Sequence, residues 1–168
     1  MKHIWSPWRM EYIQSNKKEE GCIFCKEIAL SDGPGNLIVH RGRYNFVILN
    51  RFPYTSGHIM VVPYQHCSVL EDLKPETRSE MMELANQAVS LLQSEYRAEG
   101  FNIGINIGEA AGAGIAEHLH LHIVPRWEGD TNFISALGNT RVLPELLEDS
   151  YIRIAKGWKG VETAKDNH

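Results

Sequence analysis

Long hydrophobic runs, an excess of positive charge and an even number of cysteines are all missing from this sequence of 168 residues. No apolar run approaches the ~20 residues that a membrane-spanning helix needs. The N-terminus has no apolar segment of the kind found in secretory signals. The formal net charge of −4 gives no support to nucleic-acid binding through many phosphate contacts. We therefore expect a protein of the cytoplasm that binds neither membranes nor nucleic acids.

Cysteine is scarce as well, because the chain has only three, an odd number that argues against a disulfide framework. Two of them form the pair Cys22-x-x-Cys25, which fits half of a zinc site, a redox pair or a coincidence about equally well. No second Cys-x-x-Cys follows, so a metal site built on this pair needs histidine ligands. His66 and His118 are candidates for them, and Cys67 is an alternative to His66.

The composition, 43% hydrophobic and 23% charged, is that of one ordinary globular domain. Apolar residues three and four apart predict a long helix from Pro75 to about Glu99, with Pro75 in its first turn and Gly100 just past its end. A second, shorter helix is expected from Pro144 to about Trp158. Runs of β-forming residues predict five strands: Leu37–His40, Tyr44–Leu49, His58–Val62, Phe101–Ile107 and His118–Val124.

These elements do not alternate as repeated βαβ units, so the predicted class is α+β with a mainly antiparallel five-stranded sheet. We divide the chain into an N-terminal arm (residues 1–20), a catalytic domain (21–143) and a C-terminal helix and tail (144–168) that belongs to the same domain.

Three histidines alternate with aliphatic residues in the run His118-Leu119-His120-Leu121-His122-Ile123-Val124. Alternation with period two places every second residue on one face of a strand. The three imidazoles are therefore expected on one side, with the aliphatic residues turned into a core. Two interpretations compete. Either all three imidazoles bind one catalytic metal ion, or one neutral imidazole is a nucleophile and its neighbours hold charged oxygens.

The segment directly before this run favours the nucleophile. Residues 108–114, Gly-Glu-Ala-Ala-Gly-Ala-Gly, allow the main chain to approach a ligand closely, and their N–H groups can hold a phosphate. A non-catalytic nucleotide-binding or partner-binding module is a third possibility.

The run His118–Val124 resembles the defining motif of the histidine-triad (HIT) superfamily of nucleotide hydrolases and nucleotidyl transferases. The resemblance extends to Asn50, to Gly57–Pro63 and to the Pro63-Tyr64-Gln65-His66 turn. It implies a five-stranded antiparallel sheet with a long helix, and a homodimer or higher oligomer. The segments Trp5–Met10 and Pro125–Ile134 resemble the bacterial diadenosine-tetraphosphate phosphorylases of this superfamily.

The resemblance also implies a mechanism. His120 attacks the α-phosphorus of a substrate such as diadenosine tetraphosphate and forms a covalent nucleotidyl-histidine, which inorganic phosphate or water then releases. His122 and His58 contact phosphate oxygens and assist the leaving group, and Asn50 binds the ribose. The loop groups that stabilise charge on phosphorus are those of Gly112, Gly114 and Ile115. Alternatives are a hydrolase of dinucleoside polyphosphates or of nucleoside phosphoramidates.

Two further points follow from the family. Many members carry a glutamine or serine just before the triad, whereas this chain has Gly114-Ile115-Ala116-Glu117 there. Zinc-bearing members bind the metal at positions that correspond here to two cysteines and two histidines. The resemblance thus implies a structural zinc ion held by Cys22, Cys25, His66 and His118.

Overall fold

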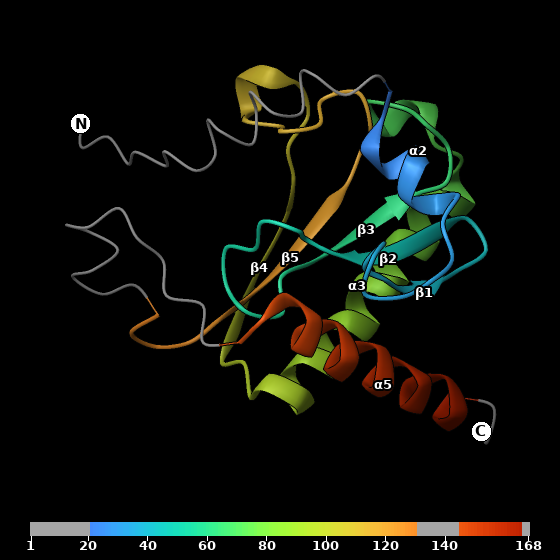
Figure 1. Cartoon of the computed structure of the whole chain (residues 1–168). Helices are drawn as coiled ribbons and strands as arrows, with labels where there is room; N and C mark the ends of the chain where they lie inside the picture. Colours follow the sequence, from blue (N-terminus) through green and yellow to red (C-terminus); the bar gives the residue numbers. More distant parts are fainter. Residues whose placement is uncertain (1–20, 131–144, 166–168) are drawn as a thin grey trace, which may run out of the picture.

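The protein is built on a five-stranded sheet, as the computed structural model in Figure 1 shows. The structure describes residues 21–130 and 145–165, and the side chains of the second range to residue 160. The predicted arm, residues 1–20, lies outside the described residues. So do residues 131–144, which include the expected start of the last helix, and residues 166–168.

The strands are all paired antiparallel, in the spatial order β1-β2-β3-β5-β4. The predicted α+β class and the five-stranded sheet are confirmed, although most of the predicted strand ends are displaced, by up to three residues. The observed strands are β1 (Ile38–Arg41), β2 (Asn45–Leu49), β3 (Ile59–Pro63), β4 (Gly100–Ile105) and β5 (Leu121–Arg126).

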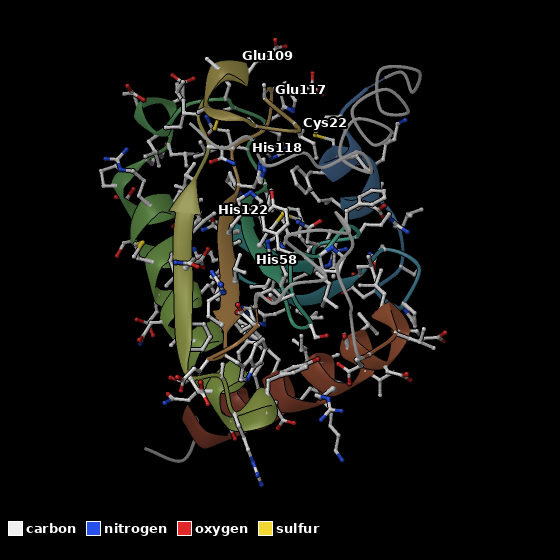
Figure 2. The ribbon with its side chains drawn as sticks, turned by 90° about the vertical axis from the view of Figure 1, so that its left-hand side faces the viewer. Cys22, His58, Glu109, Glu117, His118 and His122 are labelled. Carbon is white, nitrogen blue, oxygen red and sulfur yellow. The ribbon has the colours of Figure 1, made fainter. Side chains whose placement is uncertain are left out.

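The long helix α3 (Pro75–Tyr96) covers one face of this sheet. Its buried side chains recur every three or four residues, as expected for an amphipathic helix packed on a sheet. β2 and β3 are buried along their whole length, because both of their faces are covered. In Figure 2, α3 lies on one side of the strands, and the labelled His118, His122 and His58 lie on the other. The face away from α3 therefore carries the histidines.

The predicted end of this helix, near Glu99, is wrong. The helix ends at Tyr96, and Arg97 takes the left-handed conformation (φ 50°) that a glycine was expected to provide. A non-glycine residue in this conformation costs roughly 1–2 kcal/mol. This strain is offset by the pairing of the next residues with β5, where the main-chain N–H of Glu99 donates to Arg126 O (2.9 Å). Gly100 accordingly begins β4 instead of following the helix.

The last helix, α5 (Leu147–Lys165), packs against α3 and β1. Ile154 and Trp158 form its buried contacts, and the Trp158 ring stacks on His40 of β1 (centroids 5.1 Å apart). The helix continues past the predicted end at Trp158, since the residues that follow include no proline and Gly160 alone weakens a helix by only about 1 kcal/mol. None of the helices within residues 21–130 and 145–165 is long and apolar enough to span a bilayer.

A single carboxylate joins α3 to the turn between β1 and β2. Glu80 accepts hydrogen bonds from the main-chain N–H groups of Arg43 (2.7 Å), Tyr44 (2.7 Å) and Asn45 (2.8 Å), and a fourth from the Asn45 side chain (2.8 Å). Burial alone would raise the pKa of Glu80, but these hydrogen bonds outweigh it and lower the pKa below its usual value.

We expect Glu80→Gln to lower the free energy of unfolding by about 1–3 kcal/mol at pH 7, because one amide oxygen cannot replace two carboxylate oxygens. A carboxyl with a lowered pKa in the folded state stabilises above its unfolded pKa, and this contribution is lost as pH falls through the folded value. The difference from wild type should therefore shrink in acid. Urea unfolding at several pH values measures it, with Glu83→Gln, at an exposed site on the same helix, as control. An equal loss in both variants would contradict the assignment.

Candidate active site

The loop between β2 and β3 holds Asn50 and His58 in fixed positions. The Asn50 N–H donates to His58 O (2.9 Å), and the Thr55 hydroxyl donates to Pro125 O on β5 (2.9 Å). Gly57 has φ +78°, and a Cβ atom there would lie 3.1 Å from Leu92 of α3. A glycine is thus required before His58, because the chain turns tightly against the helix.

The predicted histidine strand is only partly regular. β5 begins at Leu121, so His118 and His120 precede it, where Leu119 N–H donates to Cys67 O (2.7 Å). Leu119, Leu121 and Ile123 are buried, as the alternation predicted. His118 and His120 are buried too, so they do not form an exposed row. The chain pairs with the segment around Cys67 before it pairs with β3, and this turns His118 toward a different set of neighbours from those of His122.

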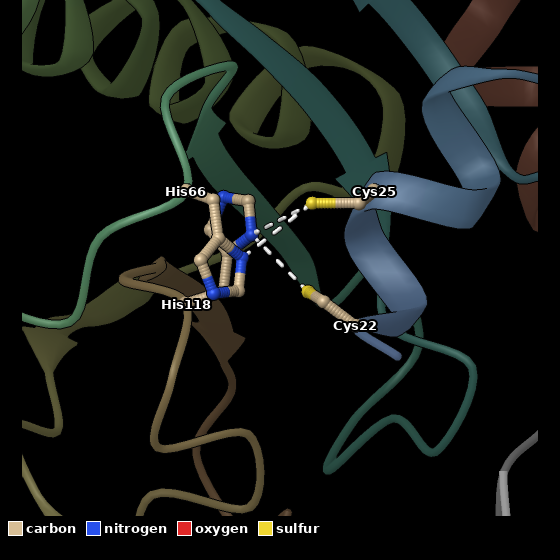
Figure 3. A group of neighbouring side chains, drawn as sticks. All are labelled: Cys22, Cys25, His66 and His118. Carbon is tan, nitrogen blue, oxygen red and sulfur yellow. Dashed lines mark hydrogen bonds between the residues drawn. The ribbon is translucent and has the colours of Figure 1, made fainter. Parts of the chain in front are cut away.

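His118 faces the cysteine pair. Its Nδ1 lies 3.2 Å from Cys22 Sγ and 3.7 Å from Cys25 Sγ, and Cys25 Sγ lies 3.5 Å from His66 Nδ1 (Figure 3). The two cysteines come from the start of the short helix α2 (Ile23–Ile28), and His66 follows β3. The His118 ring donates from Nε2 to Pro63 O (2.9 Å), because a carbonyl can only accept. Its Nδ1 lone pair is thereby directed at the cluster.

These four side chains have the donor set and the spacing of a tetrahedral zinc site. Their ligand atoms all lie within 4.8 Å of one another. Among the described residues, these four side chains are the group of cysteines, histidines and carboxylates that could hold a metal ion. Sulfur and nitrogen ligands around one zinc ion are separated by roughly 3.3–3.8 Å, which the contacts above approach. Neither Cys67 nor His120 nor His122 belongs to the cluster. Burial raises the pKa of the Cys22 thiol to about 11.

The main chain determines which ring nitrogen of His120 carries the proton. Its Nδ1 donates to the carbonyl of His118 (2.8 Å), so the neutral ring keeps an unprotonated Nε2. Burial lowers the pKa of His120, and the hydrogen bond to His118 O opposes this in part. The ring of Phe24, between the two cysteines, lies 5.3 Å from the rings of both His118 and His120. Helix α2 thus packs Phe24 against the candidate nucleophile and places the cysteine pair beside His118.

His122 and His58 form a hydrogen-bonded pair. His58 Nε2 lies 3.0 Å from His122 Nδ1, and the ring of His122 stands at 73° to that of His120 with centroids 4.8 Å apart. The other nitrogen of His58, Nδ1, accepts from the Tyr54 N–H (3.1 Å). Asn50 also reaches this ring through Nδ2 (3.3 Å). His58 therefore has both ring nitrogens engaged by protein groups.

Two histidines of the triad, His120 and His122, border a pocket on the face away from α3. The predicted nucleotide-binding residues Asn50, Gly112, Gly114 and Ile115 all line it, together with His120 and His122. His58 does not line it; this ring contacts His122 and lines a second, separate cavity. Sequence reasoning missed four lining residues: Phe52, Tyr54, Met60 and Asn106.

Sequence patterns could have indicated some of these pocket-lining residues. Phe52 and Tyr54 follow Asn50 at alternate positions of the same loop, and Asn106 continues the polar side of β4. Met60 lies opposite His122 in the sheet register, which only the pairing of β3 with β5 reveals.

A buried histidine with an unprotonated Nε2 near a Cys₂His₂ cluster, on a five-stranded antiparallel sheet, defines a histidine-triad type of protein, and comparisons with known proteins agree. The model of the HIT domain family matches residues 34–129. A relative from Mycobacterium tuberculosis, named AP-4-A phosphorylase, is 39% identical over 94% of this chain and 85% of its own length. The asymmetrical bis(5'-nucleosyl)-tetraphosphatase of Schizosaccharomyces pombe is 28% identical over 62% of this chain and 58% of its own length.

A similar solved structure also supports the assignment to the histidine-triad family. The crystal structure of a Zn-bound histidine triad family protein from Mycobacterium smegmatis is similar with a TM-score of 0.69 and 28% identity, over 86% of this chain and 97% of that chain. The chain therefore belongs to the HIT domain family of nucleotide-processing enzymes. The resemblance predicted from the triad motif is confirmed.

Proposed function

We propose that this protein cleaves a phosphoanhydride of the diadenosine tetraphosphate type through a covalent nucleotidyl-His120, with inorganic phosphate as the acceptor. The observation that carries the proposal is the hydrogen bond from His120 Nδ1 to the His118 carbonyl, which leaves Nε2 as the nucleophilic atom in a neutral ring. The relative named AP-4-A phosphorylase supports the choice of substrate and acceptor.

The reaction has two displacements. In the first, His120 Nε2 forms a bond to the α-phosphorus, and the bond from that phosphorus to the bridging oxygen breaks, so that ATP departs with the electron pair. In the second, an oxygen of inorganic phosphate attacks the same phosphorus, the N–P bond breaks, and ADP is released with His120 restored. Water in place of phosphate gives AMP.

The pocket supplies neutral donors for the phosphate oxygens. Gly114 and Ile115, through their main-chain N–H groups, and Asn106, through its side-chain amide, line the pocket and are proposed as these donors. The N–H of Gly112 already donates to Glu109 O (2.9 Å). Fixed donors of this kind stabilise charge that develops in the transition state, by several kcal/mol in comparable sites. Asn50 lies at the same pocket and is proposed to hold the ribose.

We also propose that Cys22, Cys25, His66 and His118 hold one zinc ion. Four protein ligands close the coordination sphere, so the ion would stabilise the fold and take no part in the displacements. The Zn-bound histidine triad structure supports this assignment. None of Cys22, Cys25 and Cys67 forms a disulfide within the described residues, as expected in a reducing compartment, and we propose the cytoplasm.

The expected products distinguish a phosphorylase from a hydrolase. With diadenosine tetraphosphate and isotopically labelled inorganic phosphate, we expect equal amounts of ATP and ADP, with the label in the ADP. Without phosphate, turnover should be slow and yield AMP. Chromatography of the products and mass spectrometry of the ADP measure both. AMP and ATP at the same rate with and without phosphate would instead indicate a hydrolase, and binding without turnover a non-catalytic module.

We further propose that two copies of the chain pair through β4. This strand lies at the edge of the sheet and pairs only with β5 within the described residues, while Ile103 and Ile107 are 46% and 42% exposed. Antiparallel pairing of two such edges would cover them. Sedimentation should give a dimer or a multiple of it, and Ile103→Lys should shift the protein toward monomer. A wild-type monomer at micromolar concentration would contradict the proposal.

A further inference from the structure

His58 is the histidine of the proposed catalytic set that stands apart from the pocket. Its side chain is 1% exposed, and it contacts His122 without lining the pocket that His122 borders. A group in this place cannot bind a phosphate oxygen without displacing His122. Its effect on the reaction must therefore pass through the neighbouring ring.

The main chain determines where the proton of His58 resides. The N–H of Tyr54 can only donate, so the Nδ1 atom that it meets at 3.1 Å must carry a lone pair. Asn50 does not distinguish the two ring nitrogens, because its Nδ2 lies 3.3 Å from Nδ1 and 3.5 Å from Nε2 of His58. The Tyr54 N–H therefore fixes the tautomer, and the neutral ring of His58 is protonated at Nε2.

This tautomer of His58 determines the tautomer of His122. His58 Nε2–H donates to His122 Nδ1 at 3.0 Å, so Nδ1 of His122 carries a lone pair and its own proton resides on Nε2. The ring of Tyr54 lies against both imidazoles, with centroids 4.7 Å from His58 and 6.1 Å from His122. His122 itself lines the pocket next to His120. A hydrogen-bond donor is thereby presented beside the nucleophile.

We infer that His58 is a positioning residue that fixes the Nε2–H tautomer of His122, and that His122 donates this hydrogen bond to the phosphoryl oxygens or the departing bridging oxygen. No proton is transferred in this arrangement, and both imidazoles remain neutral. The relay from Tyr54 N–H to His58 to His122 stands on the contacts alone, whereas the identity of the accepting oxygen rests on the proposed function.

Two amide substitutions separate this role from simple packing. His58→Gln can place an N–H near the position of Nε2 and so keep the donor to His122. His58→Asn keeps an acceptor near Nδ1 but is too short to reach His122. We expect kcat with diadenosine tetraphosphate to fall about 10²-fold or more in His58→Asn, as when an oxyanion donor is removed. The decrease in His58→Gln should be less than about tenfold. KM should stay close to wild type in both variants, because neither side chain touches the substrate.

A measurement without substrate tests the tautomer directly. In wild-type protein labelled with ¹⁵N in histidine, two-bond ¹H–¹⁵N correlation spectra should show a protonated, pyrrole-type Nε2 and a pyridine-type Nδ1 for His122. Loss of this pattern in His58→Asn and its retention in His58→Gln would support the inference. A proton on Nδ1 of wild-type His122, or equal losses of kcat in both variants, would overturn it. Absence of turnover by wild type would refute the proposed function and leave the spectra to decide on the relay.

Discussion

His120→Ala is expected to lower kcat with diadenosine tetraphosphate by at least about 10⁴-fold, because the substitution removes the atom that forms the covalent bond. The loss should appear in kcat, while nucleotide binding persists through Asn50 and the loop at Gly112–Ile115, which line the same pocket. Single-turnover assays with excess enzyme measure the chemical step, and equilibrium dialysis measures binding.

The variant must also be shown to fold. His120 lies outside the Cys₂His₂ cluster, so His120→Ala should keep its zinc. A matched histidine substitution, His40→Ala, removes a ring that stacks on Trp158 and is remote from the pocket. It should turn over at close to the wild-type rate. Full activity of His120→Ala would exclude a histidine nucleophile at this position, and loss of its metal would favour the hypothesis that the triad binds a catalytic ion.

Cys22→Ser is expected to reduce the zinc content from about one ion per chain to near zero and to destabilise the fold. Cys22 is a buried ligand candidate that joins the start of α2 to His118, 96 residues away in the sequence. Loss of a structural metal ranks among the largest effects of a single substitution. A loss of about 3 kcal/mol would lower the melting temperature by roughly 6–12 °C. Atomic absorption and thermal unfolding measure the two effects.

Cys67→Ala provides the control for this experiment. It also removes a buried thiol, but Cys67 lies outside the cluster, so the variant should retain its zinc. Removal of the metal from wild type with a chelator should reproduce the destabilisation seen in Cys22→Ser. An unchanged zinc content in Cys22→Ser, or an equal loss in Cys67→Ala, would contradict the assignment of the ligands.

Much of the fold could be predicted from the sequence, because the hydrophobic periodicity of each element agrees with its final environment. The apolar stripe of α3 faces the sheet, and the runs rich in β-branched residues became β2 and β3. The errors occur where tertiary contacts override local preference. Arg97 ends α3 in a left-handed conformation because Glu99 already pairs with β5. Such a contact, between residues far apart in the chain, leaves no local signal.

The site was predictable in its members and less so in its geometry. Alternation indicated that His118, His120 and His122 belong together, but it predicted a shared face. The structure directs each ring to a different partner: the cysteine pair, the His118 carbonyl and His58. These directions depend on single main-chain groups, such as Pro63 O and the Tyr54 N–H, which every sequence possesses. Residue types therefore reveal which histidines act together, whereas the protonated nitrogen of each ring follows only from its hydrogen-bond partners in the folded chain.

The measurement that tests the central claim most directly is the trapping of the covalent intermediate. Wild-type protein is mixed with diadenosine tetraphosphate radiolabelled at the α-phosphorus, without inorganic phosphate, quenched in alkali and mapped by peptide. The account predicts label on the peptide that carries His120, through a bond that survives alkali and breaks in acid. Unlabelled phosphate, added before the quench, should release this label as ADP. Turnover without any labelled protein, or label at another residue, would contradict a nucleotidyl-His120 mechanism.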